Sequence, residues 1–303
     1  MTIVMSGVAP FEATKEKVRE EVERFRALGI TPGLAAILVS DEPMSQIYVS
    51  MKQEDCKDVG IYSEICRLTE IVPQQREKEL IKIIQELNVR DDITGMLVQM
   101  PLPDFVDKDR PFQYLSPEKD VDGLTPKNKG VLMSKYELER DIIPCTAAGI
   151  VELLDYYGVE LQGKDAVIMG RSDLVGRPLR KLLEDRDATP LCCHRNTKAT
   201  LNKIASADIV ISAAGRPPEI YENDSFKLTG DMVKDGVVVV GVGGKRHPET
   251  GKVHFDVDFK SVKEKASFVT PNTNGVGLMT RGRLLWNTIL TTSKLEKILL
   301  NPY

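Results

Sequence analysis

Apolar residues along the chain follow two alternating patterns: short unbroken runs, and stretches in which they recur every three or four positions. The unbroken runs have strand length, and the periodic stretches have the spacing of amphipathic helices. In the first half we predict helix 15–28, strand 34–39, helix 45–59, strand 62–68, helix 74–87 and strand 95–99. Apolar strands that alternate with helices are typical of a parallel sheet covered on both faces.

The second half repeats this alternation. We predict helix 146–157, strand 165–169, helix 175–185, strand 190–193, helix 197–205, and strands 209–213 and 237–242. This order is typical of a doubly wound nucleotide-binding sheet. A last amphipathic pattern at about 276–300 predicts a long helix at the end of the chain.

The sequence between the two halves predicts a domain border. Residues 101–144 are rich in Pro, Asp and Lys and lack a sustained period, so we expect a long connection that carries functional loops. We therefore predict an α/β protein of two domains, an N-terminal three-layer α/β domain over 1–143 and a Rossmann-like doubly wound domain over 144–275. The helix at about 276–303 could pack back on the N-terminal domain.

Composition excludes several classes of function. The 303 residues are 42% hydrophobic and 28% charged, as in folded soluble proteins, and the net charge of -4 gives no field for holding nucleic acid. No apolar stretch approaches the ~20 residues that span a bilayer, and no secretory leader opens the chain. Five cysteines without CxxC spacing suit reduced thiols better than disulfides or a zinc site. We expect a cytoplasmic protein without a membrane, nucleic-acid or metal partner.

A glycine-bearing turn follows the first strand of the second half. It runs from Gly170, Arg171 and Ser172 to Val175 and Gly176, where a helix is predicted to begin. Glycines let the backbone approach a diphosphate, and a helix N-terminus supplies free N–H groups and a positive dipole. Ser172 replaces the middle glycine of GxGxxG, and such a turn alone can be nothing more than a turn. Its place between strand and helix favours a nucleotide site.

The end of the next strand bears on the choice of cofactor. NAD enzymes commonly present a carboxylate there to the ribose 2′-hydroxyl, whereas this chain has His194 and Arg195. Arg171 and Arg195 offer two guanidinium groups for a 2′-phosphate, which favours NADP over NAD. Arg195 could also be a solvated surface charge. His194 has no partner at metal-ligand spacing, so we interpret it as a structural or cofactor-edge residue.

Four polar residues of the first half are candidates for a substrate site. Tyr48 and Lys52 lie four residues apart, on one face of a predicted helix. A half-buried lysine loses proton affinity and can exchange protons near neutral pH. Gln99 lies at the C-terminal end of a strand, where parallel sheets place ligands, and Asp122 lies in a turn-like run. Taken singly, Tyr48 and Lys52 could be one face of an amphipathic helix, Gln99 a satisfied amide and Asp122 part of a capped turn. Together they favour a substrate site.

This combination resembles the bifunctional methylenetetrahydrofolate dehydrogenase/methenyltetrahydrofolate cyclohydrolase family. The matching motifs run through nearly the whole chain: TPGLA at 31–35, YVxxK at 48–52, VQxPLP at 98–103, KDVDG at 119–123, PCT at 144–146, GRS at 170–172, VGxP at 175–178 and GVG at 275–277. The resemblance implies a tetrahydrofolate one-carbon substrate, NAD(P)-dependent hydride removal from its methylene bridge, addition of water to the methenyl product, and a homodimer. The N-terminal domain would then be the folate-binding, catalytic domain and the second the NAD(P)-binding domain.

The resemblance also implies roles for individual residues. Lys52 would be the principal acid/base, Tyr48 would orient the substrate and the lysine, and Gln99 would support the lysine. Asp122 would hold the pterin edge. The remaining members of the expected sites are Gly275 and Val276 for the substrate, and Thr146, His194 and Arg195 with the glycine turn for the cofactor.

The chain departs from the family pattern at three places. Residues 271–280 read PNTNGVGLMT where the family has PVPGGVGPMT, residues 240–244 lack the carboxylate of the usual IDVG, and Thr146 is not followed by proline. We expect NADP-dependent oxidation of 5,10-methylenetetrahydrofolate to the 5,10-methenyl form and its hydrolysis to 10-formyltetrahydrofolate. A dehydrogenase-only enzyme, a noncatalytic folate- or nucleotide-binding homologue, and a Rossmann dehydrogenase for another small substrate are the alternatives. The presence of Lys52 favours the bifunctional enzyme.

Overall fold

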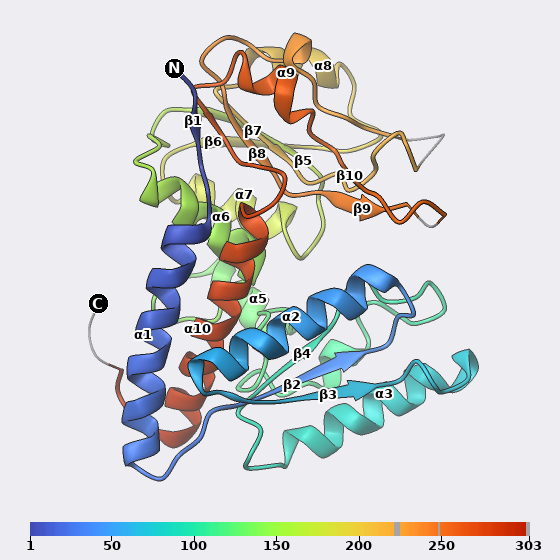
Figure 1. The fold of residues 1–303 in the computed structure, drawn as a ribbon, viewed down its shortest axis with the longest axis vertical. Helices are drawn as coiled ribbons and strands as arrows, with labels where there is room; N and C mark the ends of the chain where they lie inside the picture. The colour runs from blue at the N-terminus through green and yellow to red at the C-terminus, as the bar shows by residue number, and fades with distance from the viewer. Residues whose placement is uncertain (221–224, 248, 301–303) are drawn as a thin grey trace. The chain divides into compact units, whose positions relative to one another are not determined.

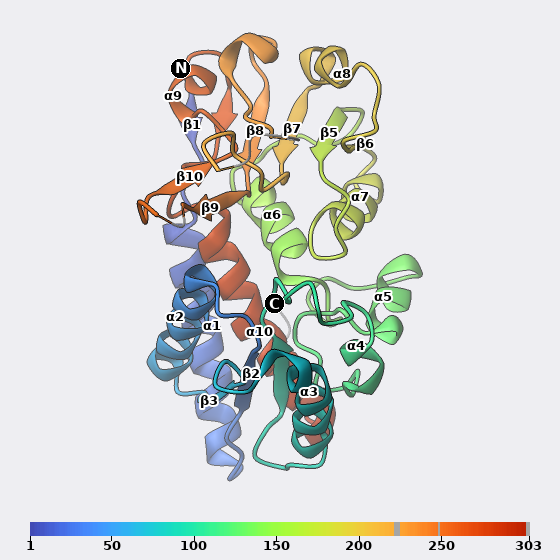
Figure 2. The ribbon, with the colours of Figure 1, turned by 90° about the vertical axis from the view of Figure 1, so that its right-hand side faces the viewer.

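The computed structural model describes residues 1–220, 225–247 and 249–300. The chain forms two compact units (Figures 1 and 2). The first unit contains Met1–Phe11 and Thr146–Thr280, and the second contains Glu12–Cys145 and Arg281–Tyr303. Each unit is therefore built from two separate stretches of sequence.

The second unit is built on a three-stranded parallel sheet in the order β3-β2-β4. Its elements are β2 (Gly33–Leu38), α2 (Pro43–Val59), β3 (Tyr62–Arg67), α3 (Pro73–Asn88), β4 (Gly95–Val98), α4 (Pro111–Tyr114), α5 (Pro126–Met133), and most of α1 (Val8–Ala27) and α10 (Val276–Glu296). All residues of β2 and β4 are buried, which explains their unbroken apolar runs. Helices α2 and α3 lie on opposite sides of the sheet (Figures 1 and 2).

Helix α10 joins this unit through a polar face. Thr292 lies 2.7 Å from Thr94, hydroxyl to hydroxyl, and Asn287 is fully buried. Asn287 Nδ2 donates to the carbonyl oxygens of Val121 (2.7 Å) and Ile143 (3.1 Å). Because these bonds satisfy buried backbone carbonyls, α10 fixes the segments that precede Asp122 and Cys145.

The first unit contains a six-stranded parallel sheet in the order β1-β11-β8-β7-β5-β6. Its elements are β1 (Ile3–Val4), α6 (Cys145–Tyr156), β5 (Asp165–Met169), α7 (Gly176–Glu184), β6 (Thr189–Cys193), α8 (Thr200–Ser206), β7 (Ile209–Ser212), a 3-10 turn at Gly230–Met232, β8 (Val238–Gly241), β9 (Gly244–Arg246), β10 (Val253–Phe255), α9 (Phe259–Lys263) and β11 (Phe268–Val269). β9 and β10 form a separate antiparallel pair. The predicted doubly wound α/β fold is confirmed.

The N-terminal residues pair with the sheet of the first unit. Residues 1–11 belong to the first unit, although we predicted that residues 1–143 form one domain. The physical reason is sheet pairing: β1 adds a parallel edge strand beside β11, and Met5 N donates to Val269 O at 2.8 Å. A two-residue strand is too short for its apolar pattern to be recognised.

The structure adds detail to the long connection and the last helix. Within 101–144 it forms the short helices α4 and α5, which lack the several turns that a periodic pattern requires. From Arg281 onward, α10 belongs to the second unit. In the part of the chain that the structure describes, no helix is both long and apolar enough to cross a membrane.

Candidate functional site

Lys52 and Gln99 are joined by a hydrogen bond. Lys52 Nζ donates to Gln99 Oε1 at 2.9 Å, and Gln99 Nε2 donates to the carbonyl oxygen of Met100 at 2.7 Å. Gln99 follows the last residue of β4 and is only 7% exposed, while Lys52 is half-buried on α2. The second bond fixes which end of the amide is aimed at the lysine, because an amide nitrogen donates and an amide oxygen accepts. The ammonium is therefore held at the carboxyl end of the sheet, as expected for a ligand site.

Tyr48 lies one turn before Lys52 on α2. The residue is 40% exposed. Partial burial raises the pKa of its hydroxyl, and the positive charge of Arg281 opposes that rise. The phenol thus remains a neutral donor and acceptor at neutral pH, suited to orienting a neighbouring polar group.

Asp122 lies beside a buried thiol. Burial raises the pKa of the Cys145 thiol well above its ordinary value, and a hydrogen bond with Asp122 adds to the rise, while the charge of Lys52 opposes it. The charges of Asp122 and Lys52 therefore both act on the Cys145 thiol. Asp122, Cys145 and Lys52 all belong to the second unit.

The neighbouring Asp120 has a different environment. It is almost fully buried, and its Oδ2 accepts from Thr125 N (2.8 Å) and Asn128 Nδ2 (2.9 Å). Burial raises the pKa of this carboxyl despite those bonds. Asp120 therefore organises the turn, whereas half-buried Asp122 is the carboxylate that a ligand can reach.

The glycine turn of the first unit has little room for side chains. Gly170 has φ +127°, and an added Cβ would lie 2.7 Å from Ala213 O. A Cβ on Gly176 would lie 2.2 Å from Gly170 O. Ser172 Oγ accepts from Val175 N at 3.2 Å, so this serine closes the turn where the usual fingerprint has glycine. The turn leads directly into α7, and Arg171 and Ser172 are exposed beside its N-terminus.

His194 and Arg195 follow β6, the strand that pairs with β5. They therefore leave the sheet at the same edge as the glycine turn. His194 Nδ1 accepts from Asn196 N at 3.2 Å, and His194 N donates to Thr197 Oγ1 at 3.0 Å, so the histidine orders its own turn. Arg195 is exposed.

In the loop before α10, Asn274 stands at a position where the family pattern has glycine. Asn274 has φ +58°, a region that glycine and, among the other residues, asparagine adopt most readily. Its carbonyl accepts from Gly7 N at 2.7 Å, and a Cβ on Gly275 would lie 2.8 Å from Pro271 O. Asn274 therefore stands where the family pattern has glycine, in a backbone conformation that asparagine adopts readily.

The other members of the expected sites flank this loop. Val276 is only 5% exposed. Thr146, at the start of α6, lies 3.3 Å from Thr280, hydroxyl to hydroxyl. Thr146, Gly275 and Val276 all belong to the first unit.

The structure adds a carboxylate that sequence reasoning missed. Asp256 is fully buried, and its Oδ2 accepts from the backbone N–H groups of Ala214 and Gly215 at 3.0 Å each. A Cβ on Gly243 would lie 2.2 Å from this carboxylate. Burial raises the pKa of Asp256 to about 6. Asp256 therefore places a carboxylate just beyond the end of β8, where the family pattern has an acidic residue and this chain has none. No pattern in the sequence predicts this position, because Asp256 follows a different strand, β10.

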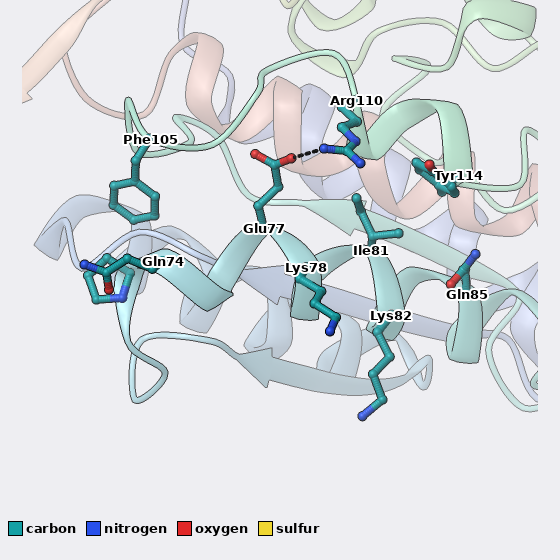
Figure 3. Close-up of a pocket in the computed structure, with 10 residues that line it drawn as sticks. Gln74, Glu77, Lys78, Ile81, Lys82, Gln85, Phe105, Arg110 and Tyr114 are labelled. Atoms are coloured by element: carbon teal, nitrogen blue, oxygen red, sulfur yellow. Dashed lines mark hydrogen bonds and ion pairs between the residues drawn. The ribbon is translucent and has the colours of Figure 1, made fainter.

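A large open groove lies elsewhere on the second unit (Figure 3). It has a volume of about 970 Å³ and runs along the outer face of α3. Its lining residues include Phe105, Ile81 and Tyr114, and an ion pair joins Glu77 to Arg110 at 2.9 Å. None of the predicted site residues lines it. Across the described ranges, no cluster of three or more His, Cys, Asp or Glu side chains could hold a metal ion.

The parallel sheets and the glycine turn define a two-part α/β enzyme with an NAD(P)-binding domain. A family model described as the tetrahydrofolate dehydrogenase/cyclohydrolase catalytic domain matches residues 5–122, and the NAD(P)-binding domain of the same family matches residues 144–296. The chain belongs to the tetrahydrofolate dehydrogenase/cyclohydrolase family.

Individual relatives agree over nearly the full length. The bifunctional protein FolD of Pyrobaculum calidifontis is 52% identical over 289 residues, 94% of this chain and 94% of that protein. The solved structure of bifunctional FolD from Campylobacter jejuni is 39% identical, with a TM-score of 0.87, covering 97% of this chain and 100% of that one. FolD of Trypanosoma brucei, solved with NADP and an inhibitor, is 32% identical, with a TM-score of 0.87 and coverage of 98% and 99%.

Replacing Gly176 with alanine tests the glycine turn. We expect Gly176→Ala to weaken binding of NADP at least ~10-fold, because the added methyl group must push Gly170 and Arg171 out of position. Isothermal titration with NADP measures the loss. Gly130→Ala is the control, since nothing lies within 4 Å of its added Cβ. Unchanged NADP affinity in Gly176→Ala would show that the cofactor does not depend on this turn.

Proposed function

We propose that this protein oxidises 5,10-methylenetetrahydrofolate with NADP and hydrolyses the 5,10-methenyl product to 10-formyltetrahydrofolate, with Lys52 as the group that moves protons. Membership of the family supports both reactions. The observation that carries the role of Lys52 is its 2.9 Å hydrogen bond to the fixed amide oxygen of Gln99.

In the oxidation, the protein mainly supplies orientation. NADP, when bound, accepts the hydride that leaves the methylene carbon. The chain's own residues hold the folate and limit its motion, so that the reacting atoms meet at a productive angle. We assign the pterin edge to Asp122, which can accept hydrogen bonds from its amine and amidine-like N–H groups. Tyr48, Gly275 and the backbone of Val276 complete the proposed folate contacts.

The hydrolysis requires proton transfer. Water adds to the methenyl carbon and loses one proton, which leaves a hydroxyl group on that carbon. The carbon–N5 bond then breaks as N5 takes up a proton and the hydroxyl gives up its own to become the formyl carbonyl, so one proton is released overall. Nζ of Lys52 carries protons between these positions, because its bond to Gln99 occupies one direction and leaves the others for water and substrate. Tyr48, one turn away, orients the substrate and the lysine.

For the cofactor, we propose NADP in preference to NAD. The exposed guanidinium groups of Arg171 and Arg195 follow adjacent parallel strands and can meet the same 2′-phosphate. Ser172, Val175, Gly176 and the N-terminus of α7 suit the diphosphate. Thr146 and His194 are proposed at the cofactor's edge.

Three broader features are also proposed from the family resemblance. The second unit would be the folate-binding, catalytic part and the first unit the cofactor-binding part. The protein would act in the cytoplasm as a homodimer. Size-exclusion chromatography with light scattering measures the oligomeric state directly.

Replacing Lys52 tests the proton-transfer role. We expect Lys52→Met to lower hydrolysis of added 5,10-methenyltetrahydrofolate at least ~100-fold, since general acid–base catalysis typically contributes that much or more. Binding of NADP should remain within about twofold, because Lys52 belongs to the other unit. Lys57→Met, an exposed lysine of the same helix, is the matched control. Hydrolysis at the wild-type rate in Lys52→Met would contradict the assignment.

Replacing Arg195 tests the choice of cofactor. We expect Arg195→Ala to raise the KM for NADP about 10-fold and to leave the KM for NAD nearly unchanged, because NADP alone carries the 2′-phosphate. Steady-state dehydrogenase kinetics with each cofactor provide the comparison. Arg140→Ala, an exposed arginine of the second unit, is the control. An equal loss for both cofactors would refute the 2′-phosphate role.

A further inference from the structure

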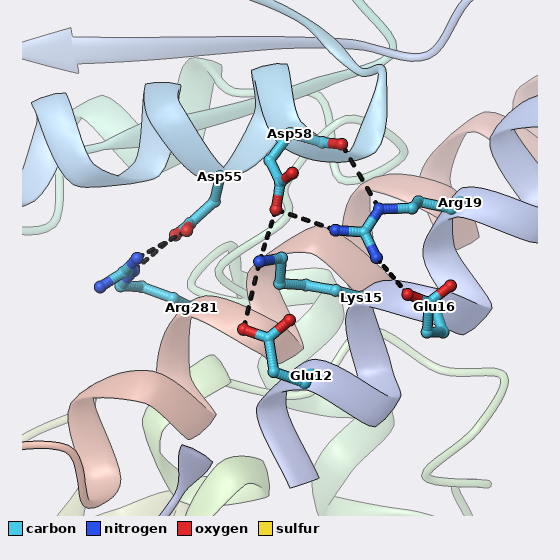
Figure 4. Close-up of polar contacts among 7 residues, drawn as sticks. All are labelled: Glu12, Lys15, Glu16, Arg19, Asp55, Asp58 and Arg281. Carbon is cyan, nitrogen blue, oxygen red and sulfur yellow. Dashed lines mark hydrogen bonds and ion pairs between the residues drawn. The ribbon is translucent and has the colours of Figure 1, made fainter. Parts of the chain in front are cut away.

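A buried ion pair joins the helix that carries Tyr48 and Lys52 to helix α10. Arg281 Nε lies 2.5 Å from Asp55 Oδ2, and Arg281 Nη2 lies 2.5 Å from Asp55 Oδ1 (Figure 4). Only 13% of the arginine side chain and 8% of the aspartate side chain are exposed. This two-point contact fixes both the distance and the rotation of the two groups.

Stability alone does not account for such a pair. Removing two charges from water costs several kcal/mol per ion, and well-packed apolar residues in place of a buried ion pair are often equally stable or more stable. The Asp55–Arg281 pair therefore indicates that the position of α2, or the charge beside it, matters for something other than stability.

Its place along α2 suggests which residues depend on it. Asp55 follows Lys52 by three residues and Tyr48 by seven, so all three lie on one face of the helix. The charge of Arg281 also opposes the rise in the pKa of Tyr48 that burial causes. The guanidinium is therefore close enough to the phenol to influence it.

A second ion pair on the same helix provides a comparison. Asp58, three residues beyond Asp55, binds α1 instead: its Oδ2 lies 2.5 Å from Lys15 Nζ and 2.9 Å from Arg19 Nη2 (Figure 4). The Asp58 side chain is 48% exposed. This pair also holds α2, but it lies further from the two candidate site residues along the helix.

We propose that Arg281, held by Asp55, is a positioning residue for the proposed reaction, which sets the rotation of α2 so that Tyr48 and Lys52 face the substrate. This inference rests on the roles proposed above for Tyr48 and Lys52. Arg281 acts through these residues, and the bond from Lys52 to Gln99 is the contact that its loss would loosen.

An apolar replacement of the pair separates position from stability. We expect Asp55→Ala/Arg281→Met to keep a melting temperature close to that of the wild type. Its kcat for hydrolysis of 5,10-methenyltetrahydrofolate should fall about 10-fold with less than a ~3-fold change in KM, because small misplacements of catalytic groups reduce the rate. The matched control, Lys15→Met/Asp58→Ala, removes the other ion pair and should retain wild-type kcat.

A conservative variant keeps the test decisive if the double variant does not fold. Arg281→Lys retains the charge but loses the two-point contact, so we expect a kcat about threefold below wild type. A wild-type kcat in both Asp55→Ala/Arg281→Met and Arg281→Lys, or in Arg281→Lys alone if the double variant is unfolded, would overturn the inference. An equal fall in kcat in the Lys15→Met/Asp58→Ala control would also overturn it.

Measuring Lys52→Met in parallel distinguishes the two proposals. If Lys52→Met is inactive and the Asp55 and Arg281 variants match the wild type, only the positioning inference fails. If Lys52→Met hydrolyses the substrate normally, the proposed function of the site fails, and the positioning inference fails with it.

Discussion

The candidate site of this protein is organised by one hydrogen bond, from Lys52 Nζ to Gln99 Oε1. Two features of the second unit make it possible. Parallel pairing of β2 with β4 places Gln99 just beyond the carboxyl end of a fully buried strand, and α2 places Lys52 beside it. The amide cannot turn its oxygen away without losing the bond from Nε2 to Met100 O. The lysine held in this direction is the group to which we assign proton transfer in the proposed hydrolysis.

The surrounding residues support this arrangement from several sides. Asn287 fixes the backbone next to Asp122 and Cys145, and Asp120 closes the turn that contains Asp122 by accepting from Thr125 N. The Asp55–Arg281 pair holds the face of α2 that also carries Tyr48 and Lys52. These groups are polar and buried, so their value lies in position rather than in the area that they remove from water.

Much of the fold and of the candidate site is readable in the sequence. Strands such as β2 and β5 are buried on both faces, so their sequences are unbroken apolar runs, and Tyr48 and Lys52 are related by helical spacing alone. Elements of two or three residues, such as β1 and β11, leave no periodic pattern, because their existence depends on a neighbour distant in sequence. For the same reason the sequence predicts neither the place of Asp256 nor the pairing of Asp55 with Arg281.

The proposed function requires that one protein catalyse both reactions. The direct measurement supplies 5,10-methylenetetrahydrofolate and NADP to the purified protein and follows the absorbance of reduced NADP and of 5,10-methenyltetrahydrofolate together. We expect reduced NADP to form while the methenyl product does not accumulate beyond the uncatalysed control, and we expect added methenyl substrate to be hydrolysed. Reduction of NADP with matching accumulation of the methenyl product, or no reduction at all, would contradict the proposed function.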